Sequence, residues 1–479
     1  MAEKNLNIDW KQNYKDKLIT MEEAAKKVKP GDVFFMGQAT TIPYPFLDEL
    51  YAHMEDYHDV GFFYNVMNYP ANMIFDHDTR EHFQLRNIYN LPIDRMAIDE
   101  HTIEVVGCTY DTYSSAMWEN GVNGYLHTFC PPDENGYCNV GCYGLTTGST
   151  TLLDKEGHMK KKFAFIDATG IYPAPGKYED TAVHVSEFDY IIECDSDMMA
   201  LDAPPPTEHD KAIASYILPY IKQDDKVQIG YGGLGEYILS QLDSVPGTFE
   251  VFTEVLCDGM VPLVESGKIS KLTASSPSGC TEETFKWLAT TDKDVQLVPR
   301  TLAIEPLSIM RQENMVAINA TFMMDLIGQA CSEAQGLKPY TGMGGSFAYI
   351  YGSMRAPGGR SFLCLRSTYV DKAGETKSNI VPWLPEGSIV SMLKSYVMFV
   401  VSEHGLADVY LKTYIDRIKA LIKIAHPDFR PWLKEKILTT PLIEEWDFKD
   451  FDMYDYKAPP VRQPHNMQPF GFKIVHEDD

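Results

Sequence analysis

The chain has 479 residues, of which 44 % are hydrophobic and 23 % are charged, and its formal net charge is −26. This length exceeds one ordinary hydrophobic core and predicts two domains, and the negative charge excludes a nucleic-acid-binding protein because a phosphate backbone requires a basic surface. No apolar run approaches the roughly 20 residues that cross a bilayer, and the polar N-terminus lacks the apolar segment of a signal peptide, so we expect a cytoplasmic protein without a membrane partner.

Strand-like and helix-like segments alternate through the N-terminal half. The apolar patterns predict two helices, at 21–28 and 43–54, and four strands, at 31–40, 60–67, 162–169 and 188–195. Apolar β-runs of this kind are typical of parallel strands buried on both faces. Strand, glycine-containing turn and helix in rotation indicate an α/β fold.

A change of composition at 200–210, with three consecutive prolines, excludes a continuing helix there. The pattern then begins again with a helix at 211–221, a strand at 226–230 and a second strand at 248–255. The sequence therefore predicts an N-terminal α/β domain over 1–205 and a C-terminal α/β domain over 206–440. The segment 441–479 has no amphipathic period, and we expect an extended tail with a flexible tip.

A glycine-rich turn opens the second half of the chain. In the stretch VQIGYGGLGEYIL (227–239), Gly230, Gly232 and Gly235 match G-x-G-x-x-G, and Glu254 follows Gly235 by 254 − 235 = 19 positions. This spacing is that of a dinucleotide-binding fingerprint, which would make the protein an NAD-dependent dehydrogenase. Glycine turns at helix N-termini also bind other anions and developing oxyanions, so the spacing leaves both interpretations open.

The nine cysteines contain no paired C-x-x-C spacing. Cys138 and Cys142 come nearest, with Cys130 close by, but no second pair matches them. The sequence therefore predicts reduced thiols, as in cytosolic proteins, and no metal site.

Six segments in chain order carry recognisable motifs. They are CPPDENGYCNVG (130–141), QIGYGGL (228–234), FTEVLCDG (252–259), GMGGSFAYIYG (342–352), VVSEHGLADV (400–409) and IAHPDFR (424–430). Together they resemble the acetyl-CoA hydrolase/transferase family, which includes butyryl-CoA:acetate and 4-hydroxybutyrate CoA-transferases. The resemblance covers most of the chain.

The resemblance implies two similar CoA-transferase-like α/β domains with largely parallel sheets and an active site between them. It also implies an enzyme that exchanges CoA between a short-chain acyl-CoA and a carboxylic acid, such as acetate. The reaction would be ping-pong, through an acyl-glutamyl anhydride and a glutamyl-CoA thioester. Coenzyme A and acyl-CoA would be substrates, with no permanently bound cofactor, and the chain would form a homo-oligomer, a dimer or a dimer of dimers.

Carried over residue by residue, the resemblance makes Glu254 the nucleophile and the Tyr231 backbone N–H the oxyanion donor. Gly345 matches a glycine that approaches the thioester. The CoA-binding residues would be Gly230, Gly232, Gly233, Gly344 and Arg360, the last standing where the family has lysine.

Some positions depart from the family pattern. Ala348 and Tyr351 replace an acid and an arginine, Asn379 replaces an arginine, and 408–414 lacks a basic motif. These differences leave the substrate open more than the reaction. An acyl-CoA hydrolase on the same scaffold is the nearest alternative, followed by a dehydrogenase and a non-catalytic CoA-binding protein.

Two other motifs favour structural roles. Glu403 and His404 could form an acid–base pair, but a structural turn is the favoured interpretation. The stretch GGSFA (344–348) is no serine nucleophile elbow, because Ala348 stands where that motif requires glycine.

Overall fold

The computed structural model describes residues 8–146, 157–196 and 203–461. The expected flexible tip of the tail and residues 200–202 of the proline-containing break lie outside the described residues. The chain forms two compact units. Unit 1 contains Met1–Asp202, Thr273–Ala303 and Pro339–Gly344, and unit 2 contains Ala203–Leu272, Ile304–Lys338 and Gly345–Asp479. The domain bounds of 1–205, 206–440 and 441–479 stay predictions.

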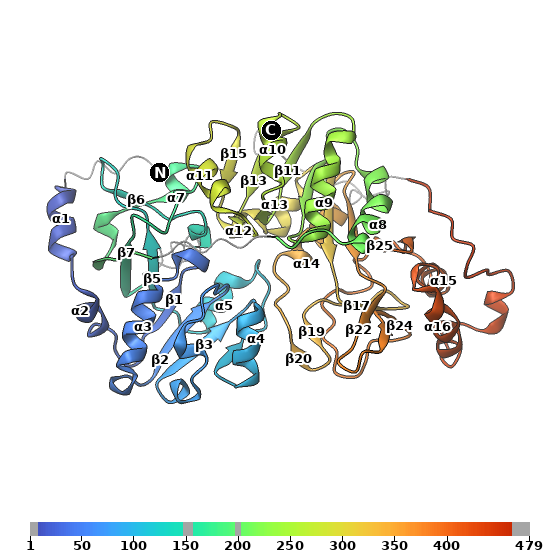
Figure 1. Cartoon of the computed structure of the whole chain (residues 1–479), viewed down its shortest axis with the longest axis horizontal. Helices are drawn as coiled ribbons and strands as arrows, with labels where there is room; N and C mark the ends of the chain where they lie inside the picture. The colour runs from blue at the N-terminus through green and yellow to red at the C-terminus, as the bar shows by residue number, and fades with distance from the viewer. Residues whose placement is uncertain (1–7, 147–156, 197–202, 462–479) are drawn as a thin grey trace. The chain divides into compact units, whose positions relative to one another are not determined.

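Unit 1 contains a seven-stranded sheet in the order β4-β3-β2-β1-β5-β7-β9, and all its neighbouring strands are parallel. The strands are β1 (Val33–Met36), β2 (Val60–Tyr64), β3 (Phe83–Asn87), β4 (Ile103–Val105), β5 (Gly124–Phe129), β7 (Lys161–Ile166) and β9 (Tyr190–Glu193). The helices are α1 (Trp10–Lys17), α2 (Met21–Ala25), α3 (Tyr44–Ala52), α4 (Pro92–Asp99), α5 (Tyr113–Glu119), α7 (Tyr178–Thr181), α11 (Glu282–Thr290) and α12 (Arg300–Ala303). Figure 1 shows β1, β2 and β3 side by side, with α3 next to them.

Aromatic side chains fill the core of this sheet. Phe34 and Phe163 meet edge to face with ring centroids 5.6 Å apart, and Phe34 stacks on Phe62 at 6.2 Å. All three are fully buried. Such pairs add to the hydrophobic free energy of burial, so this cluster holds β1, β2 and β7 in register.

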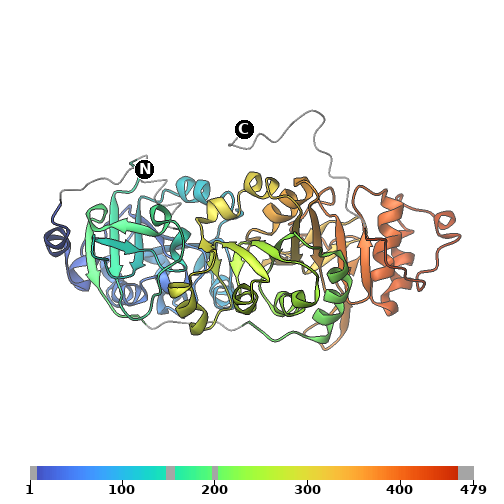
Figure 2. The same cartoon turned by 90° about the horizontal axis from the view of Figure 1, so that it is seen from above.

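Unit 2 repeats the plan, and the strands that lie in this unit follow the order β13-β11-β10-β16-β21-β25-β26 within an eight-stranded sheet. They are β10 (Lys226–Ile229), β11 (Phe249–Phe252), β13 (Ile269–Ala274), β16 (Met315–Ala320), β21 (Arg360–Cys364), β25 (Phe399–Ser402) and β26 (Gly405–Asp408). The helices are α8 (Glu208–Ile217), α9 (Gly233–Gln241), α10 (Met260–Glu265), α13 (Pro306–Met310), α14 (Ser346–Arg355), α15 (Tyr414–Ile424) and α16 (Arg430–Ile437). Strands β25 and β26 pair in antiparallel fashion, whereas the pairs β10–β11, β10–β16, β16–β21 and β21–β25 are parallel. Helices α15 and α16 pack together in Figures 1 and 2.

In both sheets, the first strand along the chain lies in the interior of the sheet. In unit 1 the chain adds strands outward from β1 on one side and then returns to β5 on the other, and in unit 2 it does the same around β10 and β16. In open α/β sheets, ligands bind outside the carboxyl ends of the strands at such a reversal. The prediction of two similar α/β domains with largely parallel sheets is confirmed.

The predicted elements are present, and most differences concern their ends. The helix predicted at 21–28 ends at Ala25, and the one predicted at 211–221 begins earlier, at Glu208. The Thr207 side chain explains the second difference, because it caps the helix by accepting from the Asp210 backbone N–H.

The described part of the tail packs on unit 2. Phe448 belongs to its core cluster, and the Tyr456 hydroxyl accepts a hydrogen bond from the Leu406 backbone N–H at 2.8 Å. The Tyr220 hydroxyl donates to the Pro459 carbonyl at 3.1 Å. Specific contacts therefore hold the tail on unit 2 as far as Pro459.

Candidate functional site

Glu254 lies just beyond the carboxyl end of β11. Strands β10 and β11 pair in parallel, with Lys226 opposite Glu250 and Val227 opposite Val251. The same offset of 250 − 226 = 24 residues places Glu254 level with Gly230, the first residue of the glycine turn. The glutamate is half-buried and follows the fully buried Thr253. Two features predicted from separate motifs thus meet at one sheet edge.

The Gly345 backbone holds the Glu254 carboxylate. The Gly345 N–H donates to Glu254 Oε2 at 2.8 Å, and Gly345 is the N-cap residue of α14. A Cβ atom at position 345 would lie 2.4 Å from Glu254 Oε2 and 2.9 Å from Ile304 Cγ2. Only glycine allows this close approach, so the fold fixes the carboxylate on a backbone amide at a helix N-terminus.

Tyr349 is a neighbour of this carboxylate that the sequence did not single out. Its side chain is fully buried in α14, one turn after Gly345. Burial raises the pKa of the Tyr349 hydroxyl well above its ordinary value, and the negative charge of Glu254 raises it further. Tyr349 therefore stays a neutral phenol at physiological pH.

Three glycines shape the turn after β10, each in a different way. The Gly230 N–H donates to the Ile318 carbonyl and continues the sheet. Gly232 has a φ of +120° and forms the N-cap of α9, a conformation that disfavours other residues. A Cβ at Gly233 would lie 3.0 Å from the Pro205 carbonyl oxygen, so this glycine lets the turn pack on the proline segment. The Tyr231 side chain is 48 % exposed.

A cavity of about 800 Å³ opens beside this turn within unit 2. Its lining includes Tyr231, Gly232 and Gly233 together with two basic residues, Arg366 and Lys372. The Arg366 side chain is half exposed and donates to Thr207 Oγ1 at 3.2 Å. Volumes of this size suit small-molecule ligands and cofactors.

Arg360 does not line this cavity. Its side chain is 1 % exposed, and its guanidinium binds the Asp225 carboxylate and the Tyr220 carbonyl. A buried ion pair of this kind holds the core of unit 2. This arrangement does not support the predicted contact of Arg360 with a CoA phosphate, because the guanidinium is already fully engaged.

The other predicted glycine, Gly344, belongs to unit 1. Its φ is +58°, and its carbonyl accepts from the Tyr110 N–H at 3.2 Å. The structure thus gives Gly344 a turn-forming role, and CoA binding by this residue stays a prediction.

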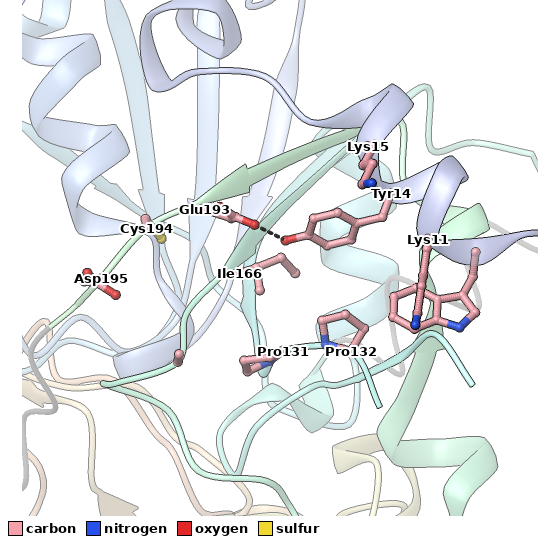
Figure 3. A pocket seen from close by; sticks show the side chains of 11 residues that line it. Lys11, Tyr14, Lys15, Pro131, Pro132, Ile166, Glu193, Cys194 and Asp195 are labelled. Carbon is pink, nitrogen blue, oxygen red and sulfur yellow. Dashed lines mark hydrogen bonds between the residues drawn. The ribbon is translucent and has the colours of Figure 1, made fainter. Parts of the chain in front are cut away.

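A second cavity, of about 640 Å³, lies in unit 1 (Figure 3). It is lined by residues of α1, by the last residues of β7 and β9, and by residues that follow β5, β7 and β9. Tyr14 donates a hydrogen bond across it to Glu193 Oε1 at 2.9 Å. No predicted site residue is part of its described lining.

Comparison with known proteins places the chain in a family. The C-terminal domain model of acetyl-CoA hydrolase/transferase matches residues 280–437. The succinyl-CoA:cyclohexane-1-carboxylate CoA transferase of Geobacter metallireducens is 30 % identical over 443 residues, covering 90 % of this chain and 97 % of the relative. The chain belongs to the acetyl-CoA hydrolase/transferase family.

A second relative agrees with this membership, and a solved structure shares the fold. The 4-hydroxybutyrate coenzyme A transferase of Clostridium kluyveri is 28 % identical, covering 88 % of this chain and 97 % of the relative. The solved structure of 4-hydroxybutyrate CoA-transferase from Porphyromonas gingivalis superposes with a TM-score of 0.72 at 23 % identity, covering 90 % of this chain and 99 % of that chain. The enzyme-class prediction, a CoA-transferase, is confirmed.

The positions that depart from the family pattern have definite surroundings. Ala348 is fully buried, and Tyr351 stacks on Phe347 with ring centroids 5.7 Å apart. Tyr396 closes on the same two rings edge to face. Asn379 lines the cavity and donates to the Arg366 carbonyl at 2.9 Å. An aromatic cluster and an amide thus occupy the positions at which the resemblance predicts charged residues.

Glu403 and His404 occupy the β25–β26 hairpin. The Glu403 carboxylate accepts from both the backbone N–H and the hydroxyl of Ser367, at 2.9 and 2.5 Å. These contacts fix a turn, in agreement with the structural interpretation.

The remaining candidates give no metal site. Cys130, Cys138 and Cys142 are buried free thiols, and burial raises the pKa of Cys130 to about 12. Within the described ranges, no cluster of three or more His, Cys, Asp or Glu side chains is arranged to hold a metal ion.

No helix of the described part of the chain is long and apolar enough to cross a membrane.

Proposed function

We propose that this enzyme exchanges CoA between a short-chain acyl-CoA and a carboxylic acid, with Glu254 as the nucleophile. The observation that supports this most is the hydrogen bond from the Gly345 amide to the Glu254 carboxylate at the carboxyl edge of the sheet. The carboxylate is held at one oxygen, beside a turn and a cavity able to admit a large ligand. The two relatives reported above are both named as CoA transferases.

Glutamate suits this chemistry because its carboxylate is already an anion at neutral pH, its ordinary pKa being about 4.3. A Glu254 oxygen attacks the thioester carbonyl carbon, the carbon–sulfur bond breaks, and CoA leaves as the thiolate. The thiolate then attacks the glutamyl carbonyl of the mixed anhydride, and the first carboxylic acid leaves as its carboxylate. A second carboxylate reverses these steps, so the acyl activation is conserved without ATP.

Each step passes through a tetrahedral oxyanion. We assign the Tyr231 backbone N–H to the oxyanion of the thioester attack, and the Gly345 N–H to the glutamyl oxygen that it already contacts. Loss of one preorganised donor costs about 10²–10³ in rate. Tyr349, a neutral phenol near the Glu254 charge, adds a polar group that stays protonated through the cycle.

We assign the 800 Å³ cavity of unit 2 to coenzyme A as a substrate. The glycine turn would receive the pantetheine, because residues without side chains admit a bulky chain. Arg366 and Lys372 replace Arg360 as the phosphate ligands, since both line the cavity and Arg360 does not. A guanidinium binds phosphate through paired N–H donors, which gives Arg366 the larger expected contribution.

Kinetics with a matched pair of variants test this proposal. Glu254→Gln should lose CoA exchange, whereas Glu250→Gln, on the same strand but paired with Lys226 at 3.3 Å, should retain it. CoA release should require a carboxylate acceptor and give parallel lines in double-reciprocal plots. Release at the same rate without an acceptor would identify an acyl-CoA hydrolase instead, and activity in Glu254→Gln would refute the nucleophile.

A further inference from the structure

Glu403 belongs to a motif that the proposed mechanism does not use. It follows the carboxyl end of β25, and β25 pairs in parallel with β21, with Val401 opposite Cys364. The same offset of 401 − 364 = 37 residues places Glu403 level with Arg366, which follows β21 and lines the cavity of about 800 Å³. A carboxylate at one strand end therefore lies level with the cation that we assign to coenzyme A at the next.

Glu403 fixes the main chain directly after Arg366. Its carboxylate accepts hydrogen bonds from the Ser367 N–H at 2.9 Å and from the Ser367 hydroxyl at 2.5 Å. The Glu403 side chain is 8 % exposed and Ser367 is fully buried, so water competes little for these bonds. In addition, Asn379 donates its backbone N–H to the Ser367 carbonyl at 2.8 Å and its side-chain amide to the Arg366 carbonyl at 2.9 Å. Two separate segments thus hold the main chain at 366–367, and the bonds to the carboxylate are of the strong, charge-assisted kind.

A second set of contacts holds the Arg366 guanidinium. Nη2 donates to Thr207 Oγ1 at 3.2 Å and to Asp210 Oδ2 at 3.4 Å. Thr207 and Asp210 form the capping box of α8, in which Asp210 Oδ2 also accepts from the Thr207 N–H at 2.8 Å. The Arg366 side chain is still 51 % exposed, and only Nη2 has hydrogen-bond partners among the described residues. One nitrogen is therefore anchored, and the rest of the guanidinium stays available to an anionic ligand.

Helix α8 also connects the two sets of contacts. It packs against β25 (Figure 1), and its His209 Nδ1 lies 3.6 Å from Glu403 Oε1. His404 Nε2 lies 3.7 Å from the same oxygen. The helix that anchors the guanidinium of Arg366 thus contacts the carboxylate that anchors its main chain. Arg366 is held at both of these points although half of its side chain is exposed.

We propose that Glu403 is a positioning residue that presents the Arg366 guanidinium to a phosphate of acyl-CoA. This inference rests on the proposed function, which assigns the cavity to coenzyme A. An unrestrained arginine side chain loses rotamer freedom when it binds a ligand, and a side chain that is held in advance loses less. Glu403 lies outside the described lining of the cavity, so it acts through Ser367 and Arg366 and not by contact with the ligand.

Kinetics with two substrates test this role. Glu403→Gln should raise KM for acetyl-CoA about 3- to 10-fold, the effect of one side chain that must be immobilised, and should change kcat less than about twofold. Acetyl-pantetheine lacks the phosphates, so its KM should stay the same in the variant. Ser367→Ala removes only the hydroxyl bond to Glu403 and should raise KM for acetyl-CoA in the same direction.

Asp325→Asn is the matched control. Asp325 is a buried carboxylate that fixes a turn by accepting the backbone N–H groups of Ile327 and Gln329, and it is not part of the described cavity lining. This variant should leave the ratio of the two KM values unchanged. Equal increases of KM for acetyl-CoA and acetyl-pantetheine in Glu403→Gln, or an unchanged KM for acetyl-CoA, would overturn the proposal.

Calorimetric titration with CoA gives a readout that does not depend on turnover. Glu403→Gln should raise the Kd for CoA about 3- to 10-fold when Arg366 is present, and less than about twofold in an Arg366→Ala background. The same increase in both backgrounds would show that Glu403 does not act through Arg366. If the protein exchanges no CoA with any acid but the Kd follows this dependence, the proposed function fails and the positioning role stands. If exchange is normal and the dependence is absent, only the positioning role fails.

Discussion

Gly345→Ala offers a sharp test of the geometry around Glu254. Gly345 has φ −92° and ψ 2°, which alanine adopts, so the substitution acts through the contacts of its added Cβ. The added Cβ would lie 2.4 Å from Glu254 Oε2. Ordinary contact begins near 3.4 Å, so the carboxylate must move by about 3.4 − 2.4 = 1.0 Å. A misplacement of about 1 Å in a catalytic group costs about 10²-fold in rate.

The assay is kcat/KM for CoA exchange, measured with the Tm of each variant. Gly107→Ala is the control, because nothing lies within 4 Å of its added Cβ. We expect Gly345→Ala to lose about 10²-fold in kcat/KM, and Gly107→Ala to lose less than about twofold. Activity of Gly345→Ala close to that of the control would refute the assignment of this amide and carboxylate as a catalytic pair.

Three further predictions use other parts of the structure. Arg366→Ala should raise KM for acyl-CoA more than it lowers kcat, and an unchanged KM would remove Arg366 from the CoA site. Arg360→Met should lower the free energy of unfolding by about 3–5 kcal/mol, because it leaves the Asp225 carboxylate buried and unpaired. Denaturant titration measures this change. A decrease below about 1 kcal/mol, which is the range of surface ion pairs, would contradict the buried pairing. Burial raises the pKa of Asp94 from 3.8 to about 7, so the folded state binds the proton more tightly. The contribution of Asp94 to stability is therefore complete below pH 3.8 and is lost as the pH rises through about 7. Asp94→Asn should remove this pH dependence of the free energy of unfolding. An unchanged pH dependence in the variant would assign it to another group.

Much of the fold could be predicted from sequence because its periodicity is strong. Apolar runs separated by glycine and proline gave β2, β7, β9, β10 and β11 within three residues of their ends. The ends themselves depend on side-chain caps such as Thr207, which propensity does not resolve. Each compact unit is also built from separate stretches of the sequence. Residues 273–303 and 339–344 belong to unit 1, and a single break in composition cannot reveal this.

The site residues could likewise be predicted only in part. Glu254 and Gly345 come from separate motifs, and the structure brings them to one hydrogen bond. Arg360 shows the limit of motif transfer, because burial and pairing with Asp225 depend on tertiary packing. Tyr349 lies within the 342–352 motif, but the motif does not single it out, and only its burial beside the Glu254 charge distinguishes it.

The covalent intermediate provides the most direct test of Glu254 as the nucleophile. The protein is incubated with an acyl-CoA in the absence of an acceptor acid, treated with borohydride and analysed by peptide mass spectrometry. We expect the Glu254 side chain to be reduced from a thioester to an alcohol, with loss of activity, and Glu254→Gln to acquire no modification. An unmodified Glu254 in a protein that remains active after borohydride, or a modification at another residue, would contradict it.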